Sequence, residues 1–323
     1  MKAINIYSKK AGPGQPVFVI AEAGINHNGD LELAKKMVRI ADETGVDAVK
    51  FQTFQASTIM TKNSGSAAHL EAGAGKEDVY SFVDRIALSA DAHRELFELC
   101  NELGLVFLST PLSFRDADLL EEIGVEAFKI ASMDLNNLPF LEYVARKGKP
   151  MILSTGMGTL GEMESALNTI YSAGNDQVAV LHCTSMYPPG PEDVNLAVIN
   201  TLRTAFDVPI GYSDHTSGNV VPAAAAVLGA CIVEKHFTLD KTMPGPDQAV
   251  SGDPDDFKKL VSDIRIIEKA LGKPVKGPPE GELGMRPNFR RSIVSEIDIP
   301  AGTIITEEML TFKRPGQGIA PCD

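Results

Sequence analysis

The 323-residue chain lacks closely spaced cysteines and long apolar runs. Its four cysteines, Cys100, Cys183, Cys231 and Cys322, are widely scattered and form no CxxC pair, so a disulfide scaffold is not expected. No apolar run approaches the roughly 18 residues that span a bilayer, and the N-terminal MKAINIYSKKAGPG has no apolar core of signal-peptide length. These absences predict a cytoplasmic protein with no membrane partner.

Positive charge is also scarce. The chain has 30 lysines and arginines against 43 aspartates and glutamates, which gives a formal net charge of −13. An acidic protein repels the phosphate backbone, so nucleic acid is not an expected partner. Any anionic small molecule must be held by a local cluster of cations that acts against this overall charge.

Several common catalytic motifs are absent as well. No GxGxxG follows the first predicted strand, and no GxxxxGK[ST], GxSxG or HExxH occurs. The sequence therefore gives no indication of a dinucleotide enzyme, a P-loop NTPase, a serine hydrolase or a zincin.

What the sequence does contain is a series of eight short apolar runs. They read VFVIAEAG, DAVKFQTF, LVFLSTPL, AFKIAS, PMILSTG, VAVLHCTS, VPIGYSDHT and CIVEKHFT. Each begins with β-prone residues and ends in polar side chains, and most are separated by the length of one helix and two loops. This rhythm predicts an α/β fold, a (β/α)8 TIM barrel over residues 1–272. Such barrels carry their active sites at the carboxyl ends of the strands.

The composition changes after the barrel. Residues 273–288, KPVKGPPEGELGMRPN, are rich in proline and glycine and predict a linker. Residues 289–323 alternate like short strands and turns, and a segment of about 35 residues cannot build a strong core alone. We expect this tail to pack on its own barrel or on a neighbouring subunit.

One connection inside the barrel is unusually long. Residues 55–88 contain the polar, glycine-rich stretch NSGSAAHLEAGAGKED. We interpret this segment as a mobile insertion over the barrel mouth that can act as a lid. The alternative is a surface loop without a role.

Two histidines end neighbouring predicted strands. His215 closes the seventh run and His236 the eighth, and adjacent strands lie about 4.8 Å apart. Two imidazoles at these positions can converge on one divalent metal and leave other coordination positions to water and substrate. Taken singly, either histidine is more often a hydrogen-bonded structural residue.

Two lysines end the second and fourth runs. Lys50 and Lys129 can point into one pocket, because alternate strands of such barrels contribute to the same interior layer. Together with neighbouring hydroxyls they form a good phosphate or carboxylate site; the candidate hydroxyls are those of Thr110, Ser132, Ser154 and Ser213. The alternative is that both lysines extend to solvent at the strand ends.

An acid ends the first run. Glu22 faces the same predicted mouth and is a candidate general acid or base. The alternative is that it binds a helix N-terminus or a backbone amide. Further polar groups near the rim, each weak as a signal alone, are Asp134, Tyr187 and Asp247.

An ordered series of motifs runs along almost the whole chain: IAEAGINHNG, AVKFQTF, FLSTP, FKIAS, ILSTGM, LHCTSMYP, GYSDHT, EKHFTLD and GPD…S. In these motifs the chain resembles the sialic acid (N-acetylneuraminate/legionaminate) synthases, which condense phosphoenolpyruvate with an N-acylated hexosamine. The tail RRSIV…DIPAGTIIT…MLTFKRPGQGI is similar to the antifreeze-like (SAF) domain that ends that family. The resemblance therefore implies a transferase with a small β-rich domain after the barrel.

The resemblance also implies roles for individual residues. Glu22 matches the acid that handles protons, and His215 and His236 match the ligands of Mn2+ or Mg2+. The phosphoenolpyruvate site corresponds to Lys50, Thr110, Lys129, Ser132, Ser154, Ser185 and Ser213. The sugar side corresponds to Gln52, Asp134, Tyr187, Asp247 and Arg314. Arg314 matches an arginine that reaches the partner subunit's active site, which implies a domain-swapped homodimer.

This sequence departs from the family pattern at three points. Some members carry asparagine at the position of Ser185, and several carry glutamate at that of Asp134. The tail ends soon after Arg314, which we interpret as a shortened or truncated SAF domain whose docking is in question.

Other functions stay open at this point. The sugar is N-acetylmannosamine, its phosphate, or a 2,4-diacetamido-trideoxyhexose of the legionaminic or pseudaminic branch, and AEAGINHNG resembles the neuraminic and legionaminic branches more. A Schiff-base aldolase using Lys129 or Lys235 is the alternative chemistry. A non-catalytic binding protein is the third reading.

Overall fold

A computed structural model describes residues 2–62, 71, 73–314 and 317–323. The chain divides into two compact units, Met1–Leu271 and Gly272–Asp323, each of which is described by itself. Part of the predicted lid, residues 63–70 and 72, lies outside the described residues.

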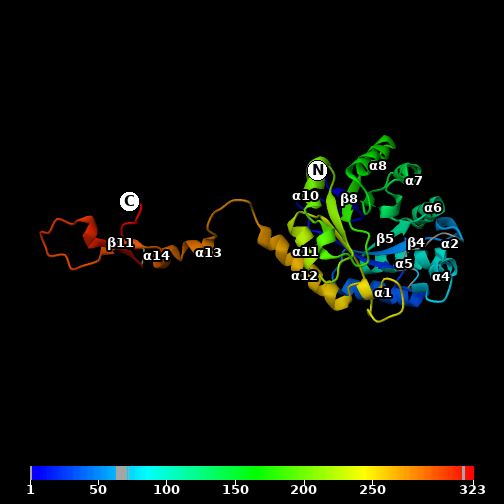
Figure 1. Cartoon of the computed structure of the whole chain (residues 1–323), viewed down its shortest axis with the longest axis horizontal. Coiled ribbons are helices and arrows are strands. Elements are labelled where there is room, and N and C mark those ends of the chain that lie inside the picture. Colours follow the sequence, from blue (N-terminus) through cyan, green and yellow to red (C-terminus); the bar gives the residue numbers. More distant parts are fainter. Residues whose placement is uncertain (1, 63–70, 72, 315–316) are drawn as a thin grey trace. The chain divides into compact units, whose positions relative to one another are not determined.

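The first unit is a nearly closed barrel of eight parallel strands (Figure 1). The hydrogen-bonded order is β5-β4-β3-β10-β9-β8-β7-β6, and the end strands β5 and β6 also lie in contact. Each of the eight apolar runs supplies one strand, which confirms the predicted TIM-barrel fold. The strands are β3 (Phe18–Gly24), β4 (Ala48–Thr53), β5 (Val106–Pro111), β6 (Phe128–Ile130), β7 (Met151–Ser154), β8 (Val178–Cys183), β9 (Ile210–Asp214) and β10 (Ile232–His236).

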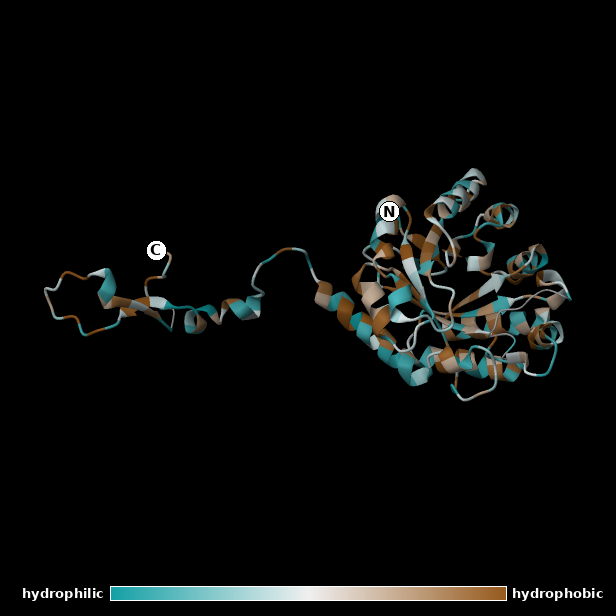
Figure 2. Cartoon of the chain, in the orientation of Figure 1, coloured by the Kyte–Doolittle hydropathy of each residue, from teal (hydrophilic) through white to brown (hydrophobic). Residues whose placement is uncertain are grey.

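Helices surround the strands and carry both hydrophobic and hydrophilic residues (Figure 2). Local sequence fixes their ends: in α5, Ser89 accepts a hydrogen bond from the Ala92 amide, and Gly104 ends the helix in a left-handed conformation with φ of 76°. The barrel's helices are α1 (Leu31–Glu43), α2 (Ala56–Ile59), α4 (Val79–Ile86), α5 (Ala90–Leu103), α6 (Phe114–Ile123), α7 (Leu138–Ala145), α8 (Leu160–Ser172), α9 (Pro191–Val194), α10 (Val198–Ala205), α11 (Val220–Val227) and α12 (Pro254–Leu271), with 3-10 turns η1 (Ser132–Asp134) and η2 (Gln248–Val250).

Strand alternation separates two hydrophobic cores. Side chains on one face, such as Ile20, Leu108 and Ile232, fill the barrel interior. Those on the other face, such as Val19 and Val233, pack under the helices. The N-terminal residues before β3 form a hairpin of β1 (Ile4–Ile6) and β2 (Lys9–Ala11), whose Ile6 joins the interior core.

The long connection between β4 and α5 has its own hydrophobic cluster. Phe54, Ala56 and Phe82 are buried together with Ile25, which follows β3. Helices α2 and α4 therefore hold the described part of this connection against the barrel mouth, and it is not a loosely attached surface loop.

The second unit is small and β-containing. Strands β11 (Ser292–Ser295) and β12 (Leu310–Lys313) pair antiparallel, with the short helices α13 (Glu280–Leu283) and α14 (Arg286–Phe289) before them and a 3-10 turn, η3 (Glu307–Met309), between them. Ile304, Ile305 and Ile319 are exposed within it. In the described part of the chain, no helix has the length and apolar character needed to cross a bilayer.

Candidate active site

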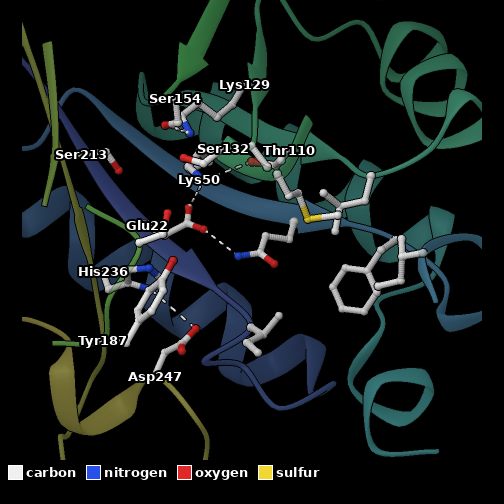
Figure 3. Close-up of a pocket in the computed structure, with 18 of the residues that line it drawn as sticks. Glu22, Lys50, Thr110, Lys129, Ser132, Ser154, Tyr187, Ser213, His236 and Asp247 are labelled. Atoms are coloured by element: carbon white, nitrogen blue, oxygen red, sulfur yellow. Dashed lines mark hydrogen bonds and ion pairs between the residues drawn. The ribbon is translucent and has the colours of Figure 1, made fainter. Parts of the chain in front are cut away.

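The carboxyl ends of the strands open into a cavity of about 1080 Å³ (Figure 3). Every one of the eight strands, or the loop that follows it, contributes to the lining. The structure brings these predicted site residues to its walls: Glu22, Lys50, Gln52, Thr110, Lys129, Ser132, Ser154, Ser185, Tyr187, Ser213, His215, His236 and Asp247.

Lys50 is enclosed by polar partners at the floor of this cavity. Its Nζ lies 2.7 Å from Glu22 Oε2 and donates to Thr110 Oγ1 at 3.1 Å. The side chain is only 4% exposed, so the lysine does not extend to solvent. Burial lowers the pKa of Lys50, but Glu22 and Glu234 outweigh this effect and leave the pKa above its ordinary value, so the ammonium stays charged.

Lys129 forms a second cationic group beside the first. Its Nζ donates to Ser154 Oγ at 2.8 Å and lies 3.4 Å from Glu234 Oε1. Burial lowers the pKa of Lys129, the nearby Lys50 ammonium lowers it further, and Glu234 opposes both. The two lysines thus share one buried, low-dielectric region in which an anion can replace their carboxylate partners.

Glu234 is a site residue that the sequence reasoning missed. Its carboxylate lies 3.8 Å from Lys50 Nζ and accepts from Ser213 Oγ at 3.1 Å. Burial raises the pKa of Glu234, but Lys129 and Lys50 outweigh this and leave it below its ordinary value. Strand alternation was the available signal, because positions 234 and 236 of one strand share a face.

Glu22 combines a charged partner with a neutral one. Besides Lys50, its carboxylate accepts from Gln52 Nε2 at 3.1 Å. Burial raises the pKa of Glu22, and the Lys50 charge opposes the rise. The pKa of Glu22 stays above its ordinary value, and a buried carboxyl group of this kind that lines the cavity can accept and return a proton.

The two histidines lie close together at the ends of the neighbouring strands β9 and β10. The ring centroids of His215 and His236 are 5.3 Å apart, and the ring of Tyr187 lies 4.2 Å from that of His215. Asp247 Oδ2 is 3.7 Å from His236 Nδ1. Burial and the nearby Glu22 charge raise the pKa of Asp247 to about 6.

A hydrogen bond fixes the tautomer of His215. Its Nδ1 lies 2.8 Å from the Thr184 carbonyl oxygen, which can only accept, so Nδ1 carries the proton and Nε2 offers a lone pair. Among the described residues, no group of three or more His, Cys, Asp and Glu side chains is arranged to hold a metal ion. Any metal here would have the two imidazoles as ligands, with water and substrate completing its coordination.

Gly156 binds one serine hydroxyl of the cavity and leaves room for another. The Gly156 amide donates to Ser132 Oγ at 2.9 Å. A Cβ atom at position 156 would lie 2.1 Å from Ser185 Oγ, so no larger residue fits without displacing that hydroxyl.

Two predicted site residues are not brought to the cavity wall. Asp134 is buried and accepts from Asn137 Nδ2 at 3.0 Å, but it does not line the cavity. Arg314 belongs to the second unit, where its guanidinium lies 5.6 Å from the centroid of the Phe289 ring. Its relation to any active site stays a prediction.

Lys235 also lies away from the cavity. Its Nζ donates to Asp214 Oδ2 and to the Thr216 carbonyl oxygen, both at 2.6 Å, on the helix side of the barrel wall. Both partners are buried, so this amine cannot reach a substrate in the cavity. Of the two lysines considered for Schiff-base chemistry, only Lys129 remains.

Comparisons with known proteins agree with this geometry. Residues 37–276 match the NeuB family, and residues 290–323 match the SAF domain. An N,N'-diacetyllegionaminic acid synthase of Legionella pneumophila is 44% identical over 98% of this chain and 90% of its own length. The N-acetylneuraminate-9-phosphate synthase of Homo sapiens is 38% identical over 94% of this chain and 84% of its own length.

A solved structure of a sialic acid synthetase is similar to this chain as well. The N-acetylneuraminic acid (sialic acid) synthetase of Leptospira borgpetersenii, crystallised with citrate, superposes with a TM-score of 0.80 and 35% identity. The match covers 88% of this chain and 94% of that one. The resemblance in the motifs is therefore confirmed: the chain belongs to the NeuB family and carries a SAF domain after its barrel.

Proposed function

We propose that this protein condenses phosphoenolpyruvate with an N-acylated hexosamine and water to give a nonulosonic (sialic) acid and phosphate. The observation that carries the proposal is the pair of buried lysines, Lys50 and Lys129, which share one cavity with the two facing histidines. The relatives named as an N,N'-diacetyllegionaminic acid synthase and an N-acetylneuraminate-9-phosphate synthase support a product of this class. This condensation would make the protein an alkyl-transferring transferase.

Phosphoenolpyruvate fits the lysine end of the cavity. Two ammonium groups and the hydroxyls of Thr110, Ser154 and Ser213 can hold its phosphate and carboxylate at fixed positions. Fixing both anionic groups orients one face of the enol toward the rest of the cavity. The protein as a whole has a net charge of −13 and repels anions. Binding of phosphoenolpyruvate therefore depends on the positive charge of these two lysines.

The bond changes follow from this placement. Carbon three of phosphoenolpyruvate attacks the aldehyde of the open-chain sugar, and water adds at carbon two. The resulting tetrahedral intermediate expels phosphate by cleavage of its C–O bond. Glu22, whose carboxylate lies beside Lys50, is positioned to move a proton in these steps.

His215 and His236 are the proposed ligands of Mn2+ or Mg2+. The fixed tautomer of His215 leaves the lone pair of Nε2 available to a metal ion and so fits such a role. When bound, the metal would supply Lewis-acid polarisation of the sugar carbonyl.

The sugar is proposed as N-acetylmannosamine or a close analogue. The alternative is a legionaminic or pseudaminic acid synthase acting on a 2,4-diacetamido-trideoxyhexose, and relatives with both names are found at 44% and 37% identity. A Schiff-base aldolase is less well supported, because Lys129 is held by Ser154 and Glu234.

Phosphate release tests the proposal. Wild-type protein with Mn2+ is expected to release phosphate from phosphoenolpyruvate in the presence of one member of a hexosamine panel, and to stop when EDTA is added. Adding Mn2+ in excess of EDTA should restore release. Absence of phosphate release with every sugar would overturn the proposed reaction. Release that EDTA leaves unchanged would overturn the metal requirement.

A domain-swapped homodimer is part of the proposal. The second unit exposes the apolar side chains of Ile304, Ile305 and Ile319, which contact with a partner subunit would cover. Family resemblance assigns Arg314 to the partner's sugar site.

We expect Arg314→Ala to raise the KM for the sugar at least about tenfold while the KM for phosphoenolpyruvate changes less. Equal losses for both substrates would argue against contact with the N-acyl group.

A further inference from the structure

One buried ion pair lies outside the cavity, on the helix side of the barrel wall. Lys235 Nζ donates to Asp214 Oδ2 at 2.6 Å, and the two side chains are 2% and 0% exposed. Tyr212, a member of the core under the helices, donates to Asp214 Oδ1 at 3.1 Å. The charges of Lys50 and Lys129 line a cavity in which an anion can bind, but those of this pair do not. A buried ion pair contributes little net stability compared with apolar residues of the same size, so this pair calls for another role.

The ion pair joins β9 to β10 one residue before each of the two histidines. Asp214 and Lys235 are partners in the parallel register of these strands. His215 follows Asp214, and His236 follows Lys235. Successive residues of an extended chain point to opposite faces, so the ion pair lies behind the wall while both histidines line the cavity. The strands are therefore joined directly behind the place where the two imidazoles begin.

The same pair holds the chain beyond His215. The Thr216 amide and Thr216 Oγ1 donate to Asp214 Oδ1 at 3.0 and 2.8 Å. The Thr216 carbonyl oxygen accepts from Lys235 Nζ at 2.6 Å. Strand pairing thus fixes the backbone before His215, and the ion pair fixes it after His215.

The position of the His215 ring depends on this backbone. The hydrogen bond from Nδ1 to the Thr184 carbonyl oxygen, at 2.8 Å, sets the rotation of the ring, whereas the backbone sets where the ring begins. The His236 ring centroid is 5.3 Å away, so a small shift of residues 214–216 would change how the two imidazoles converge. Ligands of one ion must be held to within about 0.5 Å of their productive positions.

We propose that the Asp214–Lys235 ion pair positions the two imidazoles so that they can converge on one divalent ion. Asp214 and Lys235 act as positioning residues, because neither lines the cavity in which the ion and the substrates would bind. The inference rests on the proposed function for the ion, whereas the placement of the two rings does not depend on it. An apolar pair could join the same strands, but it could not bond the amide and the carbonyl oxygen of Thr216.

Two double variants test this role. Asp214→Asn with Lys235→Met removes both charges but keeps an oxygen for the Thr216 amide, whereas Asp214→Leu with Lys235→Met removes all of these hydrogen bonds. Calorimetric titration of the full, EDTA-treated chain with Mn2+ alone should show a Kd raised about 10–100-fold in the leucine variant and less in the asparagine variant. The Kd for phosphoenolpyruvate should change much less, because Lys50 and Lys129 stand on β4 and β6.

Melting temperatures distinguish positioning from a purely structural role. Both double variants leave no unpaired charge, so their melting temperatures should stay near that of wild type. A loss of Mn2+ affinity that only follows a loss of stability from one variant to the next would overturn the proposal. Lys149→Met, at a lysine that donates to the Val125 carbonyl oxygen before β7, is the matched control and should leave the Kd for Mn2+ unchanged.

A milder variant covers the case in which the double variants do not fold. Thr216→Val keeps both charges and removes only the hydrogen bond from Thr216 Oγ1 to Asp214. We expect it to raise the Kd for Mn2+ at least about twofold. An unchanged Kd in this variant would overturn the proposal.

A crystal structure of the leucine double variant separates this inference from the metal assignment. Loss of the hydrogen bond between His215 Nδ1 and the Thr184 carbonyl oxygen, or a changed distance between the two imidazoles, would support the positioning role. Rings that stay in place would overturn it. If wild type binds no Mn2+, the metal assignment falls, and the ring positions alone decide.

Discussion

His236→Ala is expected to abolish phosphate release from phosphoenolpyruvate, with a loss of at least about a thousandfold in kcat. The His236 ring lies 5.3 Å from that of His215, and removing one of two imidazoles leaves too few donors to retain a divalent ion. Calorimetric titration with Mn2+ should show the loss of binding directly, and circular dichroism should show an intact fold. His215→Ala is expected to behave in the same way.

His182→Ala is the matched control for these variants. His182 is a strand histidine that binds the Val194 carbonyl oxygen at 2.7 Å and does not line the cavity. Its removal should lower the melting temperature but leave Mn2+ binding and EDTA-sensitive turnover in place. Near-wild-type turnover in His236→Ala would remove the metal assignment.

Lys129→Met is expected to raise the KM for phosphoenolpyruvate about 10–100-fold, because a charged hydrogen bond to the anion is lost while the apolar stem is kept. The change also leaves Glu234 with Lys50, at 3.8 Å, as its remaining ion-pair partner. Breaking a buried ion pair costs about 3–5 kcal/mol, so the melting temperature should fall as well.

A second variant separates these two effects. Lys129→Met combined with Glu234→Gln removes both charges and is expected to recover much of the stability without recovering the affinity for phosphoenolpyruvate. Recovery of both would mean that Lys129 acts only by neutralising Glu234. Lys149→Met, a change at a lysine that donates to the Val125 carbonyl oxygen away from the cavity, controls for the substitution itself.

The strands and most of the site could be predicted because short, continuous stretches of sequence determine both. A parallel strand covered on both faces leaves an uninterrupted apolar run, as in Met151–Ser154, and the polar residue that ends this run, Ser154, lines the cavity. Strand neighbours then bring distant residues such as His215 and His236 together without further information.

What the sequence did not reveal depends on the direction of side chains and on long-range packing. Lys235 was one of two candidate lysines for the alternative Schiff-base chemistry, but strand alternation turns it toward Asp214 behind the barrel wall. The same alternation turns Glu234 inward. The N-terminal hairpin gains its stability from the floor of the barrel, where Ile4 and Ile6 are buried, and three-residue strands leave almost no periodic signal.

The insertion's hydrophobic cluster shares no buried residue with either barrel core. Substitutions within it can therefore remodel one end of the cavity without disturbing the strands that carry Lys50, Lys129 and the histidines. A duplicated gene could therefore change the shape of this end of the cavity through substitutions in this segment alone, while the lysines and histidines are inherited unchanged.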